Sequence, residues 1–275
     1  MIINLTDKVV LNSPAKINLA LQVLGKNGDY HNLNSIAVFG IIHDKITIHE
    51  SDKDEVLVNG SIIPNDSITK SINYVRNKNI NLPPIKVIIE KNIPMGAGLG
   101  GGTSNAGNFL RYISNITGIE FDLKQLARIG ADVPVSYIGK SQIFSSIGDD
   151  IQEIMLPELY MLLINPAIHN STTDMFAKLK DYGHKVEFKS TYTNLNDLTN
   201  DLQKAGNDFI KYADVKIIEV IENIEKNSNS MYASMTGTGS TCFGIYKNFE
   251  DLESSYLKFK KIYPYYRIDM GVITS

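Results

Sequence analysis

The chain has no tryptophan and a single cysteine, Cys242, so no disulfide can form within it. Reduced thiols are typical of the cytoplasm, where we expect the protein to work without a disulfide partner. The net charge is only −3 at pH 7, with 27 basic against 30 acidic residues. A chain without a basic field is not expected to bind nucleic acid, and a small anionic substrate would have to meet local positive groups.

Long apolar runs are also missing. None approaches the roughly 20 residues of a membrane-spanning helix, so we expect no membrane association. The opening MIINLTDKVVLNS lacks a basic flank followed by an apolar core and does not resemble a signal peptide. With 275 residues, 43% of them hydrophobic, the chain can form one large domain or two fused lobes.

Local patterns in the first half predict a mixture of strands and helices. Alternation predicts strands at KINLALQVLG, HDKITIHES and IKVIIE, and Pro14 is expected to prevent a regular ladder just before the first. A helix is expected through SNAGNFLRYISN up to Gly118, and Asp122 with Gln125 resembles a capping box. The segment QIFSSIGDDIQEI predicts a hairpin.

A second half is expected to begin near residue 156. There YMLLINP predicts a buried strand, and MYASMTGTGSTCFGIY predicts a strand, a glycine turn and a second strand. DLTNDLQKA and VKIIEVIENIEKN have helical spacing, and the last segment predicts a helix and a closing strand. Because strands and helices follow no regular βαβα order, an α+β fold is favoured over a doubly wound sheet.

The stretch NIPMGAGLGGGTSNAGN, residues 92–108, contains six glycines. Its GAGLGG segment satisfies G-x-G-x-x-G, and Glu120 lies about where a ribose-binding acid would stand, which alone suggests a dinucleotide site. The context argues against that reading, because KNIPM separates the glycines from the preceding strand and no βαβ array surrounds them. A P-loop is disfavoured too, since no Lys-Ser or Lys-Thr follows the last glycine.

The glycine run nevertheless favours an anion. Glycine lets backbone N–H groups turn towards a ligand without a Cβ in the way. Thr103 and Ser104 follow directly, where a helix is expected to begin. The free N–H groups and positive dipole end of a helix start bind phosphate readily. The run therefore predicts a phosphate site, ahead of the alternative of a tight strand–helix turn.

Three separated segments resemble the three motifs of the GHMP kinases, small-molecule kinases of the galactose, homoserine, mevalonate and phosphomevalonate type. They are SPAKINLAL at residues 13–21, IPMGAGLGGGTSNAG at residues 93–107 and MTGTGSTCF at residues 235–243. Their order and separation match the family, and the resemblance spans nearly the whole chain. It implies a two-lobed α+β GHMP kinase fold, with a lobe like ribosomal S5 domain 2 at residues 1–155 and a ferredoxin-like lobe at residues 156–275.

Within this family the chain resembles the branch that phosphorylates a cytidyl diphosphate sugar alcohol in the non-mevalonate route to isoprenoids. PAKIN, DYHNLNS and GADVPV resemble its first motif, its Tyr-His-x-Leu segment and its catalytic-aspartate segment. There are departures from the branch. Gly28-Asp29 inverts the usual Asp-Gly order, Thr103 replaces a common serine, and Gly107 replaces a common alanine. Asp66-Ser67 stands where Asn-Leu is usual near the adenine pocket, which puts the purine contacts in doubt.

The resemblance implies a base and an electrostatic partner. Asp132 would accept the proton of a tertiary 2-hydroxyl group, which is a poor nucleophile. Asp132 is expected at the end of a short helix, where Val133 and Pro134 would make the chain turn. Lys16 would keep Asp132 ionised and stabilise the developing charge, while Asn18, on the same strand face, would orient the substrate.

The resemblance also implies ATP and Mg²⁺ as cofactors. The expected ATP-binding residues are those of the glycine run: Pro94, Met95, Gly96, Ala97, Gly98, Leu99, Gly100, Gly101, Gly102, Thr103 and Ser104. Thr103 or Ser104 could contact the metal, but no rigid carboxylate cage is evident, so mostly phosphate and water ligands are expected.

For the cytidine end, the resemblance places Tyr30 and Phe176 on the two faces of the base and His31 at its edge. Thr172 is expected to make a polar contact, and Gly237 and Gly239 to let their loop approach the phosphates, with a structural hairpin turn as the alternative. Two other functions stay open: a GHMP kinase for another alcohol, such as a phosphomevalonate-like substrate, and a catalytically silent nucleotide sensor. Retention of both Lys16 and Asp132 argues against the sensor.

Overall fold

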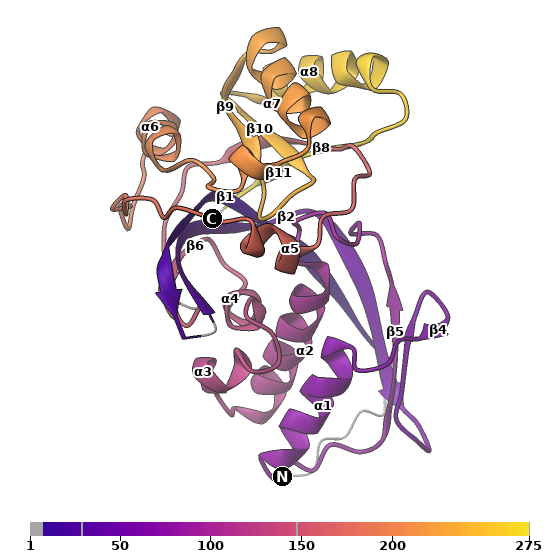
Figure 1. Ribbon diagram of the computed structural model, residues 1–275. Coiled ribbons are helices and arrows are strands. Elements are labelled where there is room, and N and C mark those ends of the chain that lie inside the picture. The colour runs from indigo at the N-terminus through magenta and orange to yellow at the C-terminus, as the bar shows by residue number, and fades with distance from the viewer. Residues whose placement is uncertain (1–7, 29, 147, 275) are drawn as a thin grey trace. The chain divides into compact units, whose positions relative to one another are not determined.

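The computed structural model (Figure 1) describes residues 8–28, 30–146 and 148–274. The chain forms two compact units, each assembled from separate segments. Unit 1 comprises Met1–Ala15, Ile42–Pro94 and Gly100–Gly139; unit 2 comprises Lys16–Ile41, Met95–Leu99 and Lys140–Ser275. The lobes predicted from the motifs, residues 1–155 and 156–275, are defined differently from these compact units, and they stay a prediction. Among the described residues no helix is both long and apolar enough to cross a membrane.

Two sheets are present in the described part of the chain. The first has the order β4-β3-β5-β2-β6-β7, with β1 (Val9–Asn27) pairing with β2 (Tyr30–Glu50). The expected break at Pro14 is wrong, because β1 continues through it. In the described part β1 pairs with no strand other than β2, and on its other side only single residues such as Lys16 and Leu21 bond to loop backbone. A strand without a full ladder on one side tolerates a residue that lacks an N–H donor.

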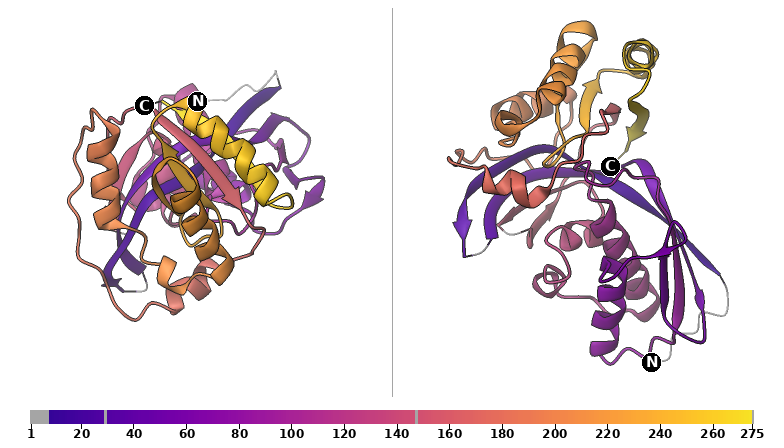
Figure 2. Two further views of the ribbon diagram at one scale, coloured as in Figure 1. Left: turned by 90° about the horizontal axis from the view of Figure 1, so that it is seen from above. Right: turned by 45° about the vertical axis from the view of Figure 1, so that its right-hand side comes forward.

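In unit 1 the second half of β2 pairs with β5, and helices pack against these strands. The elements are β3 (Glu55–Val58), β4 (Ser61–Ile62), α1 (Ser67–Asn77), β5 (Ile85–Glu90) and α2 (Gly101–Thr117). Ile48 lies opposite Val87, and both pack with Phe109 of α2 in one buried cluster. Both figures show α1 and α2 lying alongside each other (Figures 1 and 2). The predicted helix with Gly118 as its stop is confirmed, because α2 ends with Gly118 as its C-cap.

The short helices α3 (Leu123–Leu126) and α4 (Val133–Ile138) complete unit 1. The N-cap part of the predicted capping box is confirmed, since the Asp122 side chain accepts a hydrogen bond from the Gln125 N–H at 2.9 Å, while the Gln125 side-chain oxygen accepts from the Tyr74 hydroxyl at 3.3 Å. A Cβ on Gly107 of α2 would lie 2.5 Å from the carbonyl carbon of Ser136. Glycine at this position therefore allows α2 and α4 to approach closely. This close approach is a physical reason why the chain has glycine where alanine is common.

Unit 2 contains the second sheet, in the order β11-β8-β10-β9, with all neighbours antiparallel. Its strands are β8 (Leu159–Asn165), β9 (Ser230–Met235), β10 (Cys242–Tyr246) and β11 (Arg267–Ile273). Helices α7 (Val215–Asn227) and α8 (Phe249–Ile262) pack on this sheet, and Figures 1 and 2 show them beside each other. The predicted strand–turn–strand around the last motif and the closing helix and strand are confirmed.

The first half of β2 also belongs to unit 2, where it pairs with β6 (Gln142–Ser146). The hairpin predicted around residues 142–153 is confirmed, since β6 pairs antiparallel with β7 (Asp150–Glu153). The remaining helices of unit 2 are α5 (Thr172–Ala177), α6 (Leu195–Ala205) and the 3₁₀ turn η1 (Ile210–Tyr212).

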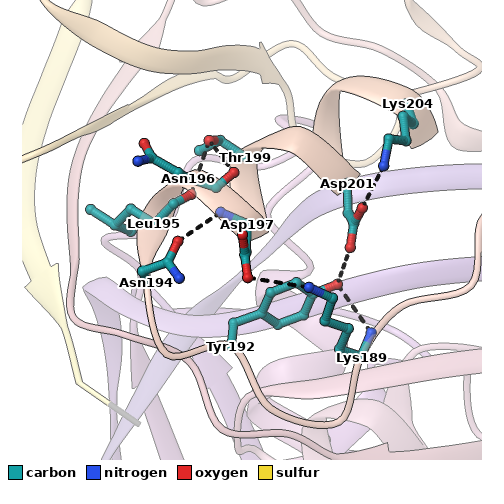
Figure 3. Close-up of polar contacts among 9 residues, drawn as sticks. All are labelled: Lys189, Tyr192, Asn194, Leu195, Asn196, Asp197, Thr199, Asp201 and Lys204. Atoms are coloured by element: carbon teal, nitrogen blue, oxygen red, sulfur yellow. Dashed lines mark hydrogen bonds and ion pairs between the residues drawn. The ribbon is translucent and has the colours of Figure 1, made fainter.

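A polar network fastens the chain before α6 to that helix (Figure 3). Asn194 caps α6 by accepting from the Asp197 N–H at 2.9 Å. The buried Tyr192 donates its hydroxyl proton to Asp201 at 3.1 Å, and Lys204 donates to the other oxygen of that carboxylate. Burial, followed by the hydrogen bond to Asp201, raises the pKa of Tyr192 to about 12.

Candidate functional site

The three motif segments of the sequence come together in unit 2. The Thr236 hydroxyl of the third motif accepts a hydrogen bond from the Asn18 N–H of the first at 2.9 Å and donates to the Gly98 carbonyl of the second at 3.2 Å. The Lys16 N–H also donates to the Leu99 carbonyl at 3.0 Å, and the Thr241 N–H donates to the Ala97 carbonyl at 3.1 Å. Residues more than 200 positions apart in the chain thus form one hydrogen-bonded node.

The glycines at this node are needed because backbone meets backbone. Gly98 has a φ of +75°, and a Cβ on it would lie 2.2 Å from the carbonyl oxygen of Thr236. Gly237, with a φ of +58°, faces it, and a Cβ there would lie 2.8 Å from the Gly98 carbonyl oxygen. These two glycines therefore serve the packing of the second motif on the third, which is an additional role beyond the predicted approach to phosphate.

Lys16 and Asn18 share one face of β1, as their spacing predicts. The Lys16 Nζ donates to the Asn18 Oδ1 at 3.0 Å, and the Asn18 Nδ2 donates to the Ser35 hydroxyl at 2.8 Å. Both side chains are almost completely buried. The Lys16 Nζ also lies 5.7 Å from the centre of the Phe144 ring. The lysine is therefore held in place within unit 2, and is not a solvated edge residue.

The start of α2, in unit 1, has the features of an anion site. Its N-cap is Gly100 in the left-handed region, with a φ of +62°, and no side chain caps the helix. The Thr103 hydroxyl donates to the Gly100 carbonyl at 2.9 Å. The Ser104 hydroxyl is buried in the first turn and has no hydrogen-bond partner among the described residues. The first-turn N–H groups and this hydroxyl can receive phosphate oxygens.

Asp132 directly precedes α4, for which it is the N-cap residue. The expected helix end at this position is wrong: Val133 and Pro134 open α4, and proline is favoured in the first turn of a helix, where its missing N–H costs nothing. The Asp132 carboxylate makes no capping hydrogen bond to α4. Its pairing with Lys16 stays a prediction, because the two residues belong to different compact units.

Aromatic rings gather near the start of β2. The His31 ring lies 4.7 Å from the Phe176 ring, centre to centre, at an angle of 35°. Phe176 in turn packs edge-on against Phe209 at 4.8 Å, and Tyr182 lies 6.5 Å from His31. The sequence predicted that Tyr30 and His31 lie close to Phe176, and the His31 ring does contact the Phe176 ring. The side chain of Tyr30 and the whole of Asp29 lie outside the described residues.

The pKa of His31 is lowered by partial burial and by the positive charge of Lys26. The imidazole is therefore neutral at pH 7, with one nitrogen as donor and the other as acceptor.

The loop of the third motif is held by Thr172, which was predicted to make a polar contact, and by two asparagines that the sequence did not reveal. Thr172 lies at the start of α5, with its hydroxyl 3.3 Å from that of Thr238. Asn170 donates to the Thr238 carbonyl at 3.0 Å, and the buried Asn207 donates to the Gly237 carbonyl at 2.9 Å. No spacing pattern marks these two asparagines, because they act on backbone that lies 68 and 30 residues away.

Three further residues predicted to bind ATP differ in their exposure. Ala97 and Leu99 are buried and hold the run through their carbonyls, whereas the Met95 side chain is 77% exposed. In the described residues no group of three or more His, Cys, Asp or Glu side chains could hold a metal. A divalent ion carried by a nucleotide would find the hydroxyls of Thr103 and Ser104 as protein oxygens.

Comparison with known proteins identifies the family. Residues 66–150 match the profile of the GHMP kinases N terminal domain. The chain is 31% identical over 253 residues to the 4-diphosphocytidyl-2-C-methyl-D-erythritol kinase of Chelativorans sp. (strain BNC1), covering 86% of both chains. It is 33% identical over 265 residues to the enzyme of that name from Ehrlichia ruminantium (strain Gardel), covering 90% of this chain and 92% of that one.

Solved structures share the fold. A crystal structure of a 4-(cytidine 5′-diphospho)-2C-methyl-D-erythritol kinase superposes with a TM-score of 0.74 at 22% identity, over 97% of this chain and 100% of that one. A homoserine kinase from Cytophaga hutchinsonii gives a TM-score of 0.67 at 15% identity, over 100% and 96% of the two chains. The predicted GHMP kinase fold is thereby confirmed. The chain belongs to the GHMP kinase family, to which these 4-diphosphocytidyl-2-C-methyl-D-erythritol kinases also belong.

Proposed function

We propose that the protein uses ATP to phosphorylate the 2-hydroxyl of 4-diphosphocytidyl-2-C-methyl-D-erythritol, in the non-mevalonate route to isoprenoid precursors. The observation that carries the proposal is the node at Thr236, where the hydroxyl of one residue joins all three motif segments. The relatives that are about a third identical over most of the chain all have the name of this kinase.

The glycine run and the start of α2 would hold the triphosphate of ATP. Kinases act mainly by positioning their substrates and neutralising charge, because phosphoryl transfer needs little covalent help from the protein. The uncapped N–H groups of α2 and the unpartnered Ser104 hydroxyl supply donors for phosphate oxygens. Mg²⁺ would be bound by phosphate and water oxygens, with Thr103 or Ser104 as a further ligand, and would neutralise charge on the transferred group.

Asp132 is the proposed base. As a bond forms between the substrate oxygen and the γ-phosphorus, the bond from that phosphorus to the β-phosphate oxygen breaks and ADP leaves. The proton of the 2-hydroxyl passes to the Asp132 carboxylate. Lys16 is the proposed electrostatic partner, and its fixed hydrogen bond to Asn18 supports this role, since a rigid cation loses no entropy on aligning with the developing charge.

The aromatic group around His31 would receive the cytosine. In the described structure the His31 ring lies against Phe176, so a base that stacks on Phe176 must displace it or slide beside it. Displaced towards the base edge, the neutral imidazole would form the hydrogen bonds that distinguish cytosine from uracil. Tyr30 is proposed as the second stacking ring. Residues 1–155 are proposed to supply the ATP side and residues 156–275 to complete the substrate site, with the reaction taking place in the cytoplasm.

A coupled ADP-release assay with a panel of alcohols tests the proposal. The panel contains the cytidyl substrate, its uridyl analogue, homoserine, mevalonate and phosphomevalonate, and phosphorus NMR identifies the phosphorylated position. We expect turnover with the cytidyl compound only. Preference for phosphomevalonate or homoserine would assign a different kinase, and ATP binding without turnover on any alcohol would assign a nucleotide sensor. Tight NAD binding without ATP binding would overturn the interpretation of the glycine run.

A further inference from the structure

A buried carboxylate in unit 1, that of Asp44 on β2, lies beside the glycine run. Its side chain is fully buried, and it receives four hydrogen bonds. The resemblance to the GHMP kinases gave no role to this residue. A buried charge is stable only when it is paired and hydrogen-bonded. The groups around such a charge therefore cannot be replaced without a large loss of stability.

The two oxygens of Asp44 have different partners. Oδ1 accepts from the N–H groups of Asn92 and Ile93, each at 2.8 Å. These residues form the short connection between β5 and the first glycine of the run. Oδ2 accepts from the Asn105 Nδ2 at 3.1 Å and from the Lys91 ammonium group. Asn105 lies in the first turns of α2, just after the run.

The carboxylate therefore holds the chain on both sides of the glycines. Positive-φ glycines give the run its shape, but glycine also leaves the backbone more conformational freedom than any other residue does. A loop of that kind keeps one conformation only if its two ends are fixed. The single carboxylate of Asp44 fixes the entry through two backbone N–H groups and the exit through Asn105.

Lys91 adds a steric argument. Its Nζ lies only 2.8 Å from the position that a Cβ on Gly101 would occupy, so the ammonium group lies against the first turn of α2. Gly101 and Asn105 are four residues apart and share one face of the helix. Paired with Asp44, the lysine adds no net charge there. The contribution of this group to phosphate binding is thus geometrical.

We infer that Asp44 is a positioning residue for ATP, one that ties the chain just before the glycine run to the first turns of α2. The inference rests on the proposed function, since it assumes that these N–H groups receive the triphosphate. A residue that only stabilised the fold would alter unfolding without changing the affinity for one substrate selectively. Asp44 is expected to affect the KM for ATP and to leave the KM for the alcohol substrate unchanged.

Two variants separate the oxygens. Asp44→Asn keeps an acceptor for the N–H groups of Asn92 and Ile93. It turns an amide donor towards the Lys91 ammonium group, which can only donate, and towards the Asn105 Nδ2, which donates to Asp44 in the unmodified chain. The exchanged pair, Asp44→Asn with Asn105→Asp, restores a donor–acceptor contact and returns a carboxylate to the face of α2 where Lys91 lies. Asp44→Ala is avoided, because it would leave the Lys91 charge buried without a partner.

Asp201→Asn is the matched control. Like Asp44, Asp201 accepts from a lysine and from a second buried donor, Tyr192, but it holds α6 in unit 2 (Figure 3). Isothermal titration with a non-hydrolysable ATP analogue, steady-state kinetics for both substrates and thermal unfolding are measured for all four proteins. The unmodified chain comes first, because failure to bind ATP would overturn both the proposed function and the inference.

For Asp44→Asn we expect ATP affinity to fall on the order of tenfold or more, with the KM for the alcohol unchanged. The exchanged pair should recover ATP affinity to within a few-fold of the unmodified chain, and Asp201→Asn should lower only the melting temperature. Unchanged ATP affinity in Asp44→Asn, or equal weakening of both substrates, would overturn the inference while leaving the proposed function intact. If Asp44→Asn does not fold, the exchanged pair decides: folding without ATP binding would overturn it.

Discussion

At the residue scale, Lys16 and Asp132 carry the proposed chemistry, and each can be tested by a single substitution. Asp132→Asn should lower turnover by roughly 10²–10⁴, the usual contribution of a general base, while the free energy of unfolding changes little because the residue is only partly buried. Lys16→Ala should be comparably damaging, and the double variant no worse than either. Single-turnover kinetics measure all three, and near-normal turnover of Asp132→Asn would remove it as the base.

Phe176 is the second residue whose role can be isolated. Stacking contributes about 1–3 kcal/mol per base, so Phe176→Ala should weaken the cytidyl substrate by roughly 5- to 150-fold. The KM for ATP should stay the same. Because the ring also packs on Phe209 at 4.8 Å, Phe176→Leu is the companion variant that keeps apolar volume without a flat face. If the leucine variant bound the cytidyl substrate normally, stacking on Phe176 would be excluded.

Residues that form the motifs were predictable, and residues that hold the motifs in place were not. The face shared by Lys16 and Asn18 follows from strand alternation, and the structure gives them a direct hydrogen bond. Asp44 and Asn105 meet across 61 positions, and no local pattern records such a contact. Buried polar partners of this kind depend on tertiary packing, which explains why Asn170, Asn207 and Asp44 remained unnoticed.

At the scale of elements, two glycines with similar backbone conformation offer a comparison, one in the glycine run and one at the end of α2. Gly98 and Gly118 both have positive φ, +75° and +68°, but a Cβ at Gly98 meets the Thr236 carbonyl, whereas nothing lies within 4 Å of one at Gly118. Gly118→Ala should cost about 1–2 kcal/mol of stability and leave catalysis alone. Gly98→Ala should also separate the second motif from the third and reduce turnover by roughly 10²-fold. Equal kinetics for both variants would show that the close approach has no role.

Element boundaries show where sequence patterns are informative. The hairpin of β6 and β7 and the strand pair around the last motif were predictable from alternation and turn residues. The short α5 was missed because six residues give no helical period, although Ser171 followed three positions later by Asp174 is a capping signal, and the Asp174 N–H does bond to the Ser171 hydroxyl. β2 was taken for a shorter strand, since alternation alone does not show where a 21-residue strand begins.

At the scale of the whole molecule, alkaline pH should destabilise the fold through two tyrosines. Burial raises the pKa of Tyr232 to about 12, and that of Tyr192 also reaches about 12. An unfolded phenol loses its proton near pH 10, so between pH 10 and 12 the unfolded chain binds fewer protons and the free energy of unfolding falls. Tyr232 alone should account for about 2–3 kcal/mol.

Urea unfolding at pH 9, 10, 11 and 12 measures this loss, with Tyr232→Phe and Tyr192→Phe as the variants that cannot ionise. Each should lose less stability than the unmodified chain over the same interval. A parallel decline in all three proteins would assign the effect to other groups.

The lone cysteine has one more consequence. Cys242 is fully buried in β10, its thiol lies against the Ile217 carbonyl of α7, and burial raises the pKa of that thiol. A thiol reagent can reach it only in molecules whose second sheet has come apart, and no other thiol in the chain competes for the reagent. The rate at which the reagent labels the native protein therefore measures how often unit 2 opens transiently. ATP or the cytidyl substrate should slow the labelling of Cys242 to the extent that its binding stabilises folded unit 2 against opening.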